Sequence, residues 1–239
     1  MRLIINVIAA ATCLQSAYAQ QTADLQDDTW KQCRANDPDA RIAGCRLLID
    51  SGTASPADLA SAYFARGTAY RQKGRFSEAL DDFDAAILAN PSLTDVYGER
   101  GITYTILGRL NDAIPDFTHV IEIYPQLAYP YYNRGICYEL IGLTDLAIED
   151  ITKSIEIEPR AEFRYERRGT IYFRKKDLDR ALADYGQALV INPQYAPALY
   201  ARGIVKVKKG DLAGGGADIA AAKHIRPTID IEMTRAGVR

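Results

Sequence analysis

The sequence predicts an all-α protein built from stacked helical repeats. An Arg-Gly pair recurs five times at a spacing of 34 residues, at Arg66-Gly67, Arg100-Gly101, Arg134-Gly135, Arg168-Gly169 and Arg202-Gly203. In the first four copies, one tyrosine stands three residues before the arginine and another stands three residues after the glycine. Self-similarity at one fixed period is typical of arrays of helix pairs. The rest of the chain is expected to lead into this array or to cap its end.

The first residues, 1–19, have the pattern of a signal peptide. Arg2 precedes an apolar run from Leu3 to Ala11, and Ala17-Tyr18-Ala19 supplies the small residues that a signal peptidase recognises. We expect cleavage before Gln20 and export, which means the periplasm in a Gram-negative bacterium. The alternatives are secretion, a lipid anchor at Cys13, and an uncleaved anchor. The apolar run is shorter than the ~20 residues that a membrane helix needs.

Residues 20–59 are expected to form a degenerate helical hairpin. Apolar residues recur at helical spacing on both sides of a turn at Asn36-Asp-Pro-Asp39. In an oxidising compartment Cys33 and Cys45 could form a disulfide across this hairpin, worth about 3 kcal/mol for a loop of this size. Two buried thiols are the alternative. We interpret Cys137, on a later repeat helix, as a small apolar core residue.

Five regular repeats are predicted to follow. Their ranges are 60–93, 94–127, 128–161, 162–195 and 196–227. Each is expected to contain two helices with apolar residues at three-and-four spacing. Ser55 and Pro56 are suited to begin the first of these helices, as N-cap and first helical residue. A proline after each second helix marks the end of the repeat: Pro91, Pro125, Pro159, Pro193 and Pro227.

The turn inside each repeat has its own pattern. Glycines are expected to end the first helices, at Gly74, Gly108, Gly142 and Gly210. Residues of the N-cap type are then expected to start the second helices, at Ser77, Asn111, Asp145 and Asp179.

Small residues recur where the two helices of a repeat would cross. The glycine of each Arg-Gly pair on the first helix, and an alanine such as Ala79 or Ala113 on the second, let the backbones approach. The residues that recur every 34 positions resemble the tetratricopeptide repeat across residues 60–227, with Tyr where Trp is common and Arg where Leu is common. The resemblance implies a right-handed α-solenoid of antiparallel helix pairs, with a concave face lined mainly by first helices. The cysteine hairpin and the glycine-rich fifth repeat resemble small exported alphaproteobacterial proteins of this family.

A column of aspartates recurs in step with the arginines. Its members are Asp82, Asp116, Asp150, Asp184 and Asp218. An arginine on the first helix and an aspartate on the second could form a partly buried bidentate pair. Five equivalent copies favour an architectural role over a catalytic one.

The end of the chain carries two further signals. Gly214-Gly-Gly216 is expected to weaken the last second helix by about 1 kcal/mol per glycine relative to alanine. Residues 228–239 contain Ile229, Met233 and Val238, enough for a short helix, and are expected to cap the array.

The sequence shows no recognisable catalytic, cofactor or metal motif. A net charge of −2 gives no basic field for nucleic acid. His119 and His224 are isolated and no Cys-x-x-Cys is present, so no metal site is predicted. No phosphate loop or Ser-His-Asp motif is found. We therefore expect a non-catalytic protein without a cofactor.

A peptide-binding surface is the predicted functional site. Helical geometry turns one side of the first helices toward the concave face, where aromatic and charged residues would form a groove for an extended or helical segment. The predicted binding residues are Phe64, Arg71, Tyr129, Tyr132, Asn133, Phe163, Arg167, Phe173 and Arg174. The alternative is that some of these rings only pack between adjacent repeats.

The predicted function is a scaffold that binds protein segments in the assembly or regulation of cell-envelope complexes. One alternative is an accessory binder of envelope polymer, either peptidoglycan or exopolysaccharide, with rings stacked on sugars. Another is self-association into a homo-oligomer. No stable membrane span is expected once the signal peptide is removed.

Overall fold

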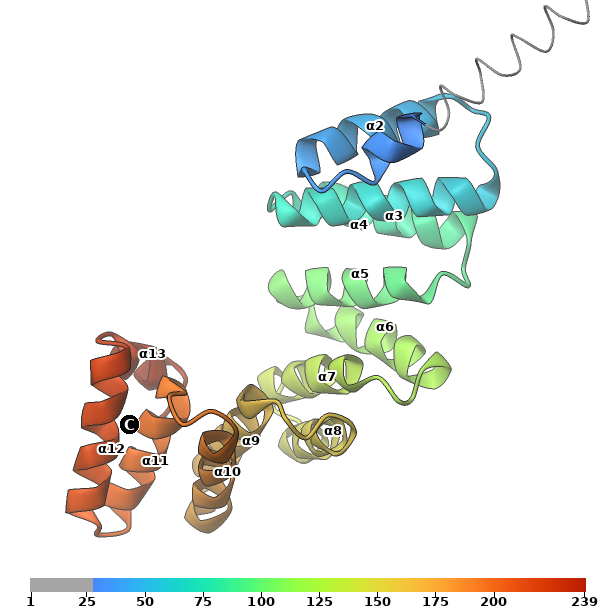
Figure 1. Cartoon of the computed structure of the whole chain (residues 1–239). Helices are drawn as coiled ribbons and strands as arrows, with labels where there is room; N and C mark the ends of the chain where they lie inside the picture. Colours follow the sequence, from blue (N-terminus) through green and yellow to red (C-terminus); the bar gives the residue numbers. More distant parts are fainter. Residues whose placement is uncertain (1–27) are drawn as a thin grey trace, which may run out of the picture. The chain divides into compact units, whose positions relative to one another are not determined.

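A computed structural model describes residues 28–239, which are mostly helical and contain no strand. The predicted signal peptide, the cleavage site before Gln20 and Cys13 lie outside the described residues. The described residues divide into two compact units, 28–108 and 109–239, whose helices are drawn in Figure 1. In the described part, every helix is too short or too polar to cross a membrane.

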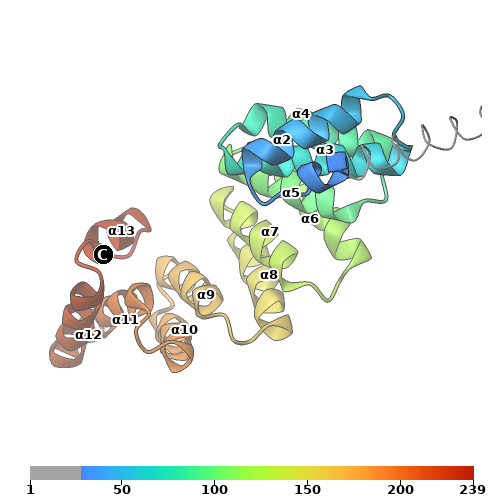
Figure 2. The same cartoon turned by 45° about the horizontal axis from the view of Figure 1, so that its top comes forward.

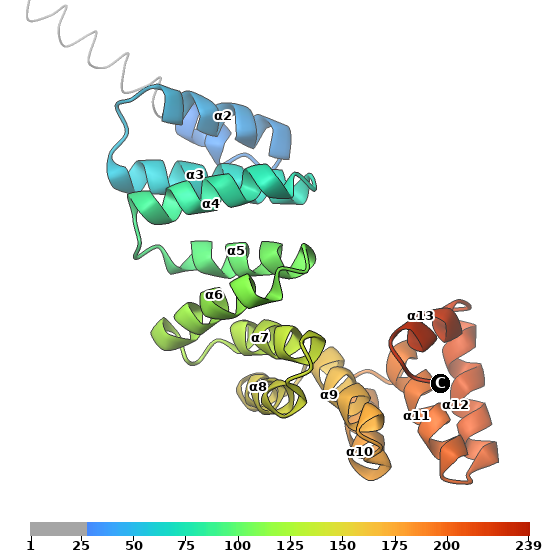
Figure 3. The ribbon, with the colours of Figure 1, turned by 180° about the vertical axis from the view of Figure 1, so that it is seen from behind.

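The described part of the first unit begins with helical residues 28–33 and continues through four helices. These are α2 (Pro38–Asp50), α3 (Pro56–Gln72), α4 (Phe76–Ala89) and α5 (Thr94–Ile106). The side chain of Asp37 accepts a hydrogen bond from the backbone of Ala40 and caps α2, and Ser55 caps α3 by accepting from the backbone of Asp58. Helices α3 and α4 lie side by side as an antiparallel pair (Figure 3).

The second unit contains eight helices in chain order. These are α6 (Leu110–Ile123), α7 (Ala128–Leu140), α8 (Thr144–Ile157), α9 (Glu162–Arg174), α10 (Leu178–Ile191), α11 (Ala196–Lys208), α12 (Leu212–Ile225) and α13 (Ile229–Arg235). Helices α7–α8, α9–α10 and α11–α12 form three successive pairs, and α13 packs mainly against α11 (Figure 2). The predicted all-α fold of paired helices is confirmed.

The turn between the helices of a pair is shorter than the sequence suggested. The four glycines predicted to end the first helices all have positive φ, between 71° and 93°, and Lys176 takes the same left-handed conformation at φ 62°. This residue reverses the chain so sharply that a single residue leads into the next helix. The prediction that Ser77, Asn111, Asp145 and Asp179 are N-caps was therefore wrong, because they already lie inside the second helices.

The Tyr-x-x-Arg-Gly-x-x-Tyr pattern forms the interior of a helix pair. Arg66 on α3 donates to both carboxylate oxygens of Asp82 on α4, at 2.8 and 2.7 Å. Its guanidinium also lies 5.6 and 5.9 Å from the ring centres of Tyr63 and Tyr70, which adds cation–π attraction. The same bidentate pair recurs at Arg134–Asp150, Arg168–Asp184 and Arg202–Asp218. In these four pairs, each within one unit, the arginine and aspartate columns are architectural.

The pairs Arg66–Asp82 and Arg202–Asp218 show how the two partners change each other's pKa. Hydrogen bonds to Asp82 raise the pKa of Arg66 above its usual value. Burial raises the pKa of Asp82 above its usual value and outweighs the bonds from Arg66, which lower it. The carboxyl is nevertheless ionised at neutral pH, because only a carboxylate can accept on both oxygens from one guanidinium. At Asp218 a second cation is present, Lys206 at 2.9 Å. Burial, which raises the pKa of Asp218, is there outweighed by the bonds from Arg202 and Lys206, and the pKa is lowered.

Glycines allow a close crossing of the two helices in the pair α11–α12. A Cβ atom on Gly203 would lie 2.8 Å from the carbonyl oxygen of Gly215, and a Cβ on Gly215 would lie 2.7 Å from that of Gly203. By contrast, a Cβ on Gly216 would meet nothing within 4 Å. The expectation that the three consecutive glycines act alike therefore needs correction, since Gly215 is required by packing.

Alanine at these two neighbouring positions is expected to have opposite effects. Gly215→Ala forces the two backbones apart and should lower the free energy of unfolding by about 2 kcal/mol. Gly216→Ala should raise it by up to about 1 kcal/mol, because alanine is the better helix former. Urea unfolding followed by circular dichroism measures both. Equal effects of the two substitutions would contradict the glycine-to-glycine crossing.

The C-terminal segment closes the hydrophobic core of the second unit. Ile229 and Val238 are fully buried and Met233 is 4% exposed, and all three belong to one cluster with residues of α10 and α11. Arg174 on α9 donates to the carbonyl oxygen of Ala236 at 2.5 Å. These contacts hold the segment after α12 against the first helices α9 and α11.

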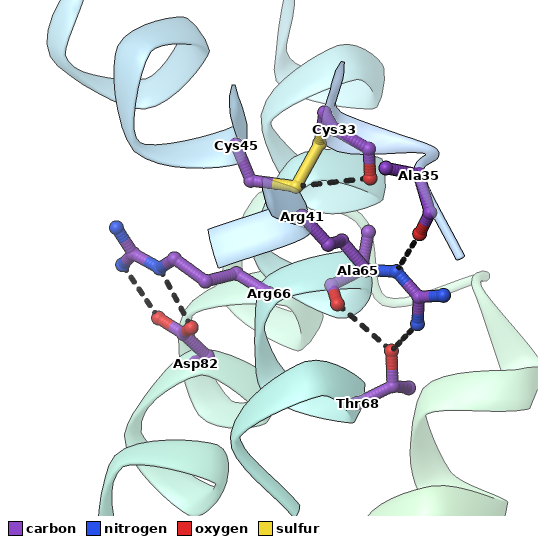
Figure 4. Close-up of a disulfide and its surroundings, with 8 residues drawn as sticks. All are labelled: Cys33, Ala35, Arg41, Cys45, Ala65, Arg66, Thr68 and Asp82. Carbon is purple, nitrogen blue, oxygen red and sulfur yellow. Dashed lines mark hydrogen bonds and ion pairs between the residues drawn. A yellow bond between two sulfur atoms is a disulfide. The ribbon is translucent and has the colours of Figure 1, made fainter. Parts of the chain in front are cut away.

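A disulfide between Cys33 and Cys45 ties helical residues 28–33 to α2 (Figure 4). Both cysteines are fully buried, beside Leu48 of α2 and Ala62 of α3. Gly44 permits the close approach, because a Cβ there would lie 2.5 Å from the backbone nitrogen of Cys33. The predicted bridge is therefore present.

Hydrogen bonds of Arg41 connect the segment around the disulfide to α3. Arg41 of α2 donates to the carbonyl oxygen of Ala35 at 2.9 Å, and its Nη1 lies 3.5 Å from the hydroxyl of Thr68 on α3 (Figure 4). These bonds link the disulfide hairpin to the first regular pair. Cys137 is fully buried on α7, as a core residue would be.

Candidate binding surface on the first helices

Most of the predicted binding residues lie in the second unit, on the first helices α7 and α9. Side chains of these two helices meet in two places, one aromatic and one charged. We call this surface the α7–α9 face and define it by Tyr129, Tyr132, Asn133, Glu139, Phe163, Glu166 and Arg167.

The aromatic contact of the α7–α9 face joins Tyr132 and Phe163. Their rings meet edge to face, with centroids 5.1 Å apart. Such T-shaped pairs are favourable beyond the area they bury. Phe163 remains 39% exposed, so much of its ring is open to solvent. Burial raises the pKa of Tyr132 to about 12, which keeps its hydroxyl neutral at physiological pH.

The charged contact is centred on Glu139, whose side chain is 5% exposed. One carboxylate oxygen accepts from Nε of Arg167 and the other from Nη1 of Arg174, both at 2.6 Å. One carboxylate thus holds two guanidinium groups, and the cluster carries one net positive charge. Among the described residues, Arg167 has no further hydrogen bond, so its Nη groups can donate to a ligand.

The first unit has a related ion pair between its own first helices. Arg71 on α3 lies 2.7 Å from Glu99 on α5. These residues are 28 positions apart, as are Glu139 and Arg167, but the two charges are exchanged. Phe64, also in the first unit, points its ring toward Phe83 at 6.3 Å and packs within its own helix pair.

Two of the remaining predicted residues, Asn133 and Phe173, contact other residues of the second unit. The side-chain amide of Asn133 donates to the carbonyl oxygen of Tyr129, one helical turn earlier, at 3.0 Å. The ammonium of Lys208 lies 5.8 Å from the ring centre of Phe173. The structure thus groups Tyr132 and Phe163 with Arg167 and Arg174, through Glu139, and leaves Phe64 and Arg71 in the other unit.

Glu166 is a polar residue whose role the sequence did not reveal. It occupies the position that holds an aromatic ring in three other repeats, at Phe64, Tyr132 and Tyr200. Its carboxylate accepts from the hydroxyl of Thr170 at 2.9 Å, and that hydroxyl lies 3.1 Å from the hydroxyl of the buried Tyr185. With Thr170 donating to Glu166, Tyr185 becomes the donor to Thr170. Burial raises the pKa of Glu166 above its ordinary value.

The raised pKa of Glu166 predicts a dependence of stability on pH. The folded protein holds a proton on Glu166 at pH values where the unfolded chain, with an ordinary pKa of 4.5, has lost it. Stability is therefore lost as pH rises through the folded pKa. Glu166→Gln, which cannot ionise, is expected to raise the melting temperature relative to the parent at pH 7.5 but not at pH 4. Thermal unfolding at the two pH values tests this, and an equal difference at both would contradict it.

The chain resembles known proteins both in its repeat sequences and in its fold. Tetratricopeptide repeat models match residues 60–93, 94–127 and 128–160, and a TPR repeat model matches residues 169–210. A search of curated proteins gave no significant match.

Several solved structures share the fold. A crystal structure of MamA protein has 22% sequence identity and a TM-score of 0.65, covering 73% of this chain and 95% of that one. A MamA fragment from Desulfovibrio magneticus RS-1 has 19% identity and a TM-score of 0.65, with coverages of 72% and 96%. YrrB, described as a TPR protein with an unusual peptide-binding site, has 16% identity and a TM-score of 0.63, with coverages of 80% and 97%.

Proposed function

Because this chain belongs to the tetratricopeptide repeat family, we propose that it is a non-catalytic scaffold that binds segments of other proteins through the α7–α9 face. The proposal rests on two groups of α9 that stand four residues apart, the exposed ring of Phe163 and the guanidinium of Arg167. An aromatic ring supplies contact area at low cost in entropy, and a guanidinium donates to carbonyl or carboxylate oxygens. The peptide-binding site named for YrrB, a protein of the same fold, supports this use of the fold.

A double substitution on the α7–α9 face is expected to release the partner. Phe163→Ala/Arg167→Gln removes the exposed ring and the available donors, while Arg174 still neutralises Glu139. Tyr132 is kept because it is half-buried. The measurement is affinity purification of the tagged protein from its own envelope fraction, followed by mass spectrometry. A protein partner should come down with the parent and be at least tenfold depleted with the variant.

The matched control lies on a second helix. Lys153→Ala/Glu156→Ala removes an exposed ion pair of α8 and should retain every partner. Melting temperatures of both variants must stay near that of the parent. Recovery of the same partners by the parent and by the Phe163/Arg167 variant would overturn the assignment of the α7–α9 face. Sedimentation with insoluble peptidoglycan or exopolysaccharide, lost in that variant, would favour the polymer-binding alternative.

The proposed site of action is the cell envelope, after export to the periplasm. Two observations support export: the predicted signal peptide at residues 1–19, and the disulfide between Cys33 and Cys45, a bond that persists in oxidising compartments. Cell fractionation with mass spectrometry of the N-terminus should find the protein in the periplasm, starting at Gln20. A cytoplasmic protein starting at Met1, or one with a lipid on Cys13, would contradict this.

Self-association is a second candidate, favoured by exposed apolar residues at the turn between α7 and α8. Leu140, Ile141, Leu143 and Leu146 are 57, 37, 46 and 43% exposed. At the same positions one repeat later, Lys175 pairs with Asp145 and Arg180 pairs with Asp177. Light scattering over a concentration series should show mass above that of a monomer, and Leu143→Asp/Leu146→Arg should abolish it. A monomer at all concentrations would exclude this candidate.

A further inference from the structure

We propose that residues 228–239 occupy a binding surface on the first helices α9 and α11, and that the partner segment which replaces them is a short amphipathic helix. This inference rests on the proposed peptide-binding function and specifies the shape of the ligand. We call this the α9–α11 surface and define it by Phe173, Arg174 and Tyr200. It lies entirely in the second unit.

The C-terminal segment lies across the first helices of the last two pairs. Helix α13 packs mainly against α11, and the carbonyl oxygen of Ala236 accepts from Nη2 of Arg174 on α9 at 2.5 Å. Elsewhere in this unit a first helix packs on the second helix before it, as α9 does on α8 and α11 on α10. Helix α13 makes its main contacts with α11 instead, and Leu212 and Ile225 of α12 remain exposed. The segment thus covers a face made by first helices.

The surface under the segment is aromatic. Tyr200 of α11 belongs to the hydrophobic cluster that contains the three buried apolar side chains of the segment, and Phe173 of α9 packs against that cluster. Tyr200 is 8% exposed, whereas Tyr132, at the same position two repeats earlier, is only half-buried. Residues of the predicted binding face are therefore already covered in the last two pairs, by a part of the same chain.

The sequence of the segment encodes a short amphipathic helix with a defined end. Ile229 and Met233 lie one turn apart and are buried, while Ile231 is exposed on the opposite side of α13. The backbone N–H of Val238 donates to the carbonyl oxygen of Met233 at 2.9 Å, and Gly237 has a φ of 83°, as in the Schellman ending of a helix. This ending returns the side chain of Val238 to the apolar side of the helix.

Arg174 connects the segment to the α7–α9 face. Its Nη1 donates to Glu139, and its Nη2 donates to the carbonyl oxygen of Ala236. The last carbonyl groups of a helix carry partial negative charge, so a guanidinium complements them. Gly237 permits the approach, because a Cβ there would lie 3.1 Å from Nε of Arg174. A partner segment that extends from the α7–α9 face to Arg174 therefore competes with residues 228–239.

The segment is held weakly enough to be replaced. It buries three apolar side chains, but this gain is opposed by the entropy lost when twelve residues become ordered. Helix α13 has seven residues, too few for a helix to be stable without tertiary contacts. Its ion pairs Arg226–Glu232 and Lys223–Asp230 are exposed and contribute little. Release of the segment therefore costs little compared with unfolding of the array.

A synthetic peptide of residues 226–239 tests the surface on the full chain. The peptide carries a fluorescent label and is titrated by anisotropy against the parent and against Ile229→Asp/Met233→Asp, whose own segment cannot bury its apolar side. The variant should bind the peptide about tenfold more tightly or better, because a segment docked in nine molecules of ten lowers the apparent affinity of a competitor to that extent. Arg174→Gln added to the variant should weaken binding several-fold, while Arg167 still neutralises Glu139.

The matched control changes the other side of the same helix. Ile231→Asp/Thr234→Asp adds the same charge at two exposed positions of α13 and should bind the peptide as weakly as the parent. Circular dichroism must show that both variants remain helical. A peptide with aspartate at positions 229 and 233 should bind neither variant.

Hydrogen exchange of the parent gives an independent test that needs no variant. The backbone amides of residues 236–238 should exchange at least tenfold faster than those of α11, because the segment opens without unfolding of the array. Exchange of both at one common rate would make the segment a permanent part of the fold and would overturn the inference.

Peptide selection tests the shape of the partner segment. A random twelve-residue library displayed on phage is selected against Ile229→Asp/Met233→Asp and eluted with the peptide of residues 226–239. The selected peptides should carry apolar residues four positions apart, and the parent should bind them about tenfold more weakly than the variant does. Selected peptides without this spacing would overturn the amphipathic helix as the ligand.

The contrary outcomes separate this inference from the proposed function. Equal binding of the peptide by Ile229→Asp/Met233→Asp and by Ile231→Asp/Thr234→Asp would overturn the inference, and the α7–α9 face would still be judged by Phe163→Ala/Arg167→Gln. Partners retained by that last variant would overturn the proposed function even where the peptide of residues 226–239 binds. A dimer of the parent that Ile229→Asp/Met233→Asp converts to a monomer would assign the surface to a second copy of the chain and overturn the partner helix.

Discussion

Arg168→Ala is expected to lower the free energy of unfolding by about 3 kcal/mol. The substitution leaves Asp184, whose side chain is 8% exposed, without the two hydrogen bonds that neutralise it. It also removes a bond to Thr152 and the contact with the ring of Tyr165. The effect lies at the lower end of the range for buried pairs, because the arginine side chain is 17% exposed.

A double-mutant cycle separates the ion pair from the rest of this effect. Asp184→Ala alone should also lower the free energy of unfolding substantially. Added to Arg168→Ala, the same substitution should lower it far less, because no unpaired charge remains. Arg180→Ala is the matched control. Its exposed pair with Asp177 should contribute less than about 1 kcal/mol. If urea unfolding showed that Arg168→Ala and Arg180→Ala lower the free energy of unfolding equally, the recurring arginines would not have the stabilising role assigned to them.

Loss of the disulfide is expected to cost about 3 kcal/mol, by the loop-closure model for cysteines 12 positions apart. Cys33→Ala/Cys45→Ala avoids burying hydroxyl groups at two fully buried positions. The loss should be local. Hydrogen exchange of backbone amides should accelerate in α2 and stay unchanged in α9 and α10.

Treatment of the parent with a thiol reductant should reproduce the effect of the double substitution. Cys137→Ala, at a buried cysteine of α7, serves as the control and should leave exchange in α2 unchanged. Unaltered protection of α2 in the reduced protein would show that the hairpin is held by its apolar contacts with Leu48 and Ala62 alone.

The 34-residue period was sufficient to predict the fold and the role of its main polar residues. An arginine and an aspartate that recur at the same spacing could form a pair inside a repeat, so Arg66–Asp82 could be foreseen. The start of the second helices could not be foreseen from cap residues, because the left-handed glycine shortens the turn. Asp145, expected as a cap, pairs instead with Lys175 of the next repeat.

At the candidate site, the sequence could not predict which partners the long charged side chains contact. The sequence placed Arg167 and Arg174 on the expected face but could not show that both converge on Glu139, since long side chains reach several neighbours. Arg164 is a second example. It is 5% exposed at a position where other repeats carry Ala, Val or Pro, and it reaches Glu158 at 2.6 Å. Its charge gave no sign of burial.

The spacing of the ion pairs determines how easily the number of repeats in such a chain can change. Arg66, Arg134, Arg168 and Arg202 each pair with an aspartate 16 residues later, inside the same repeat, so duplication or deletion of one of these whole repeats leaves neither member of such a pair behind. The pair Glu139–Arg167 spans 28 residues and joins two repeats, so the same event would separate its members. The number of repeats can thus change at little energetic cost to the interior, whereas the α7–α9 face belongs to one particular junction and cannot be copied with a single repeat.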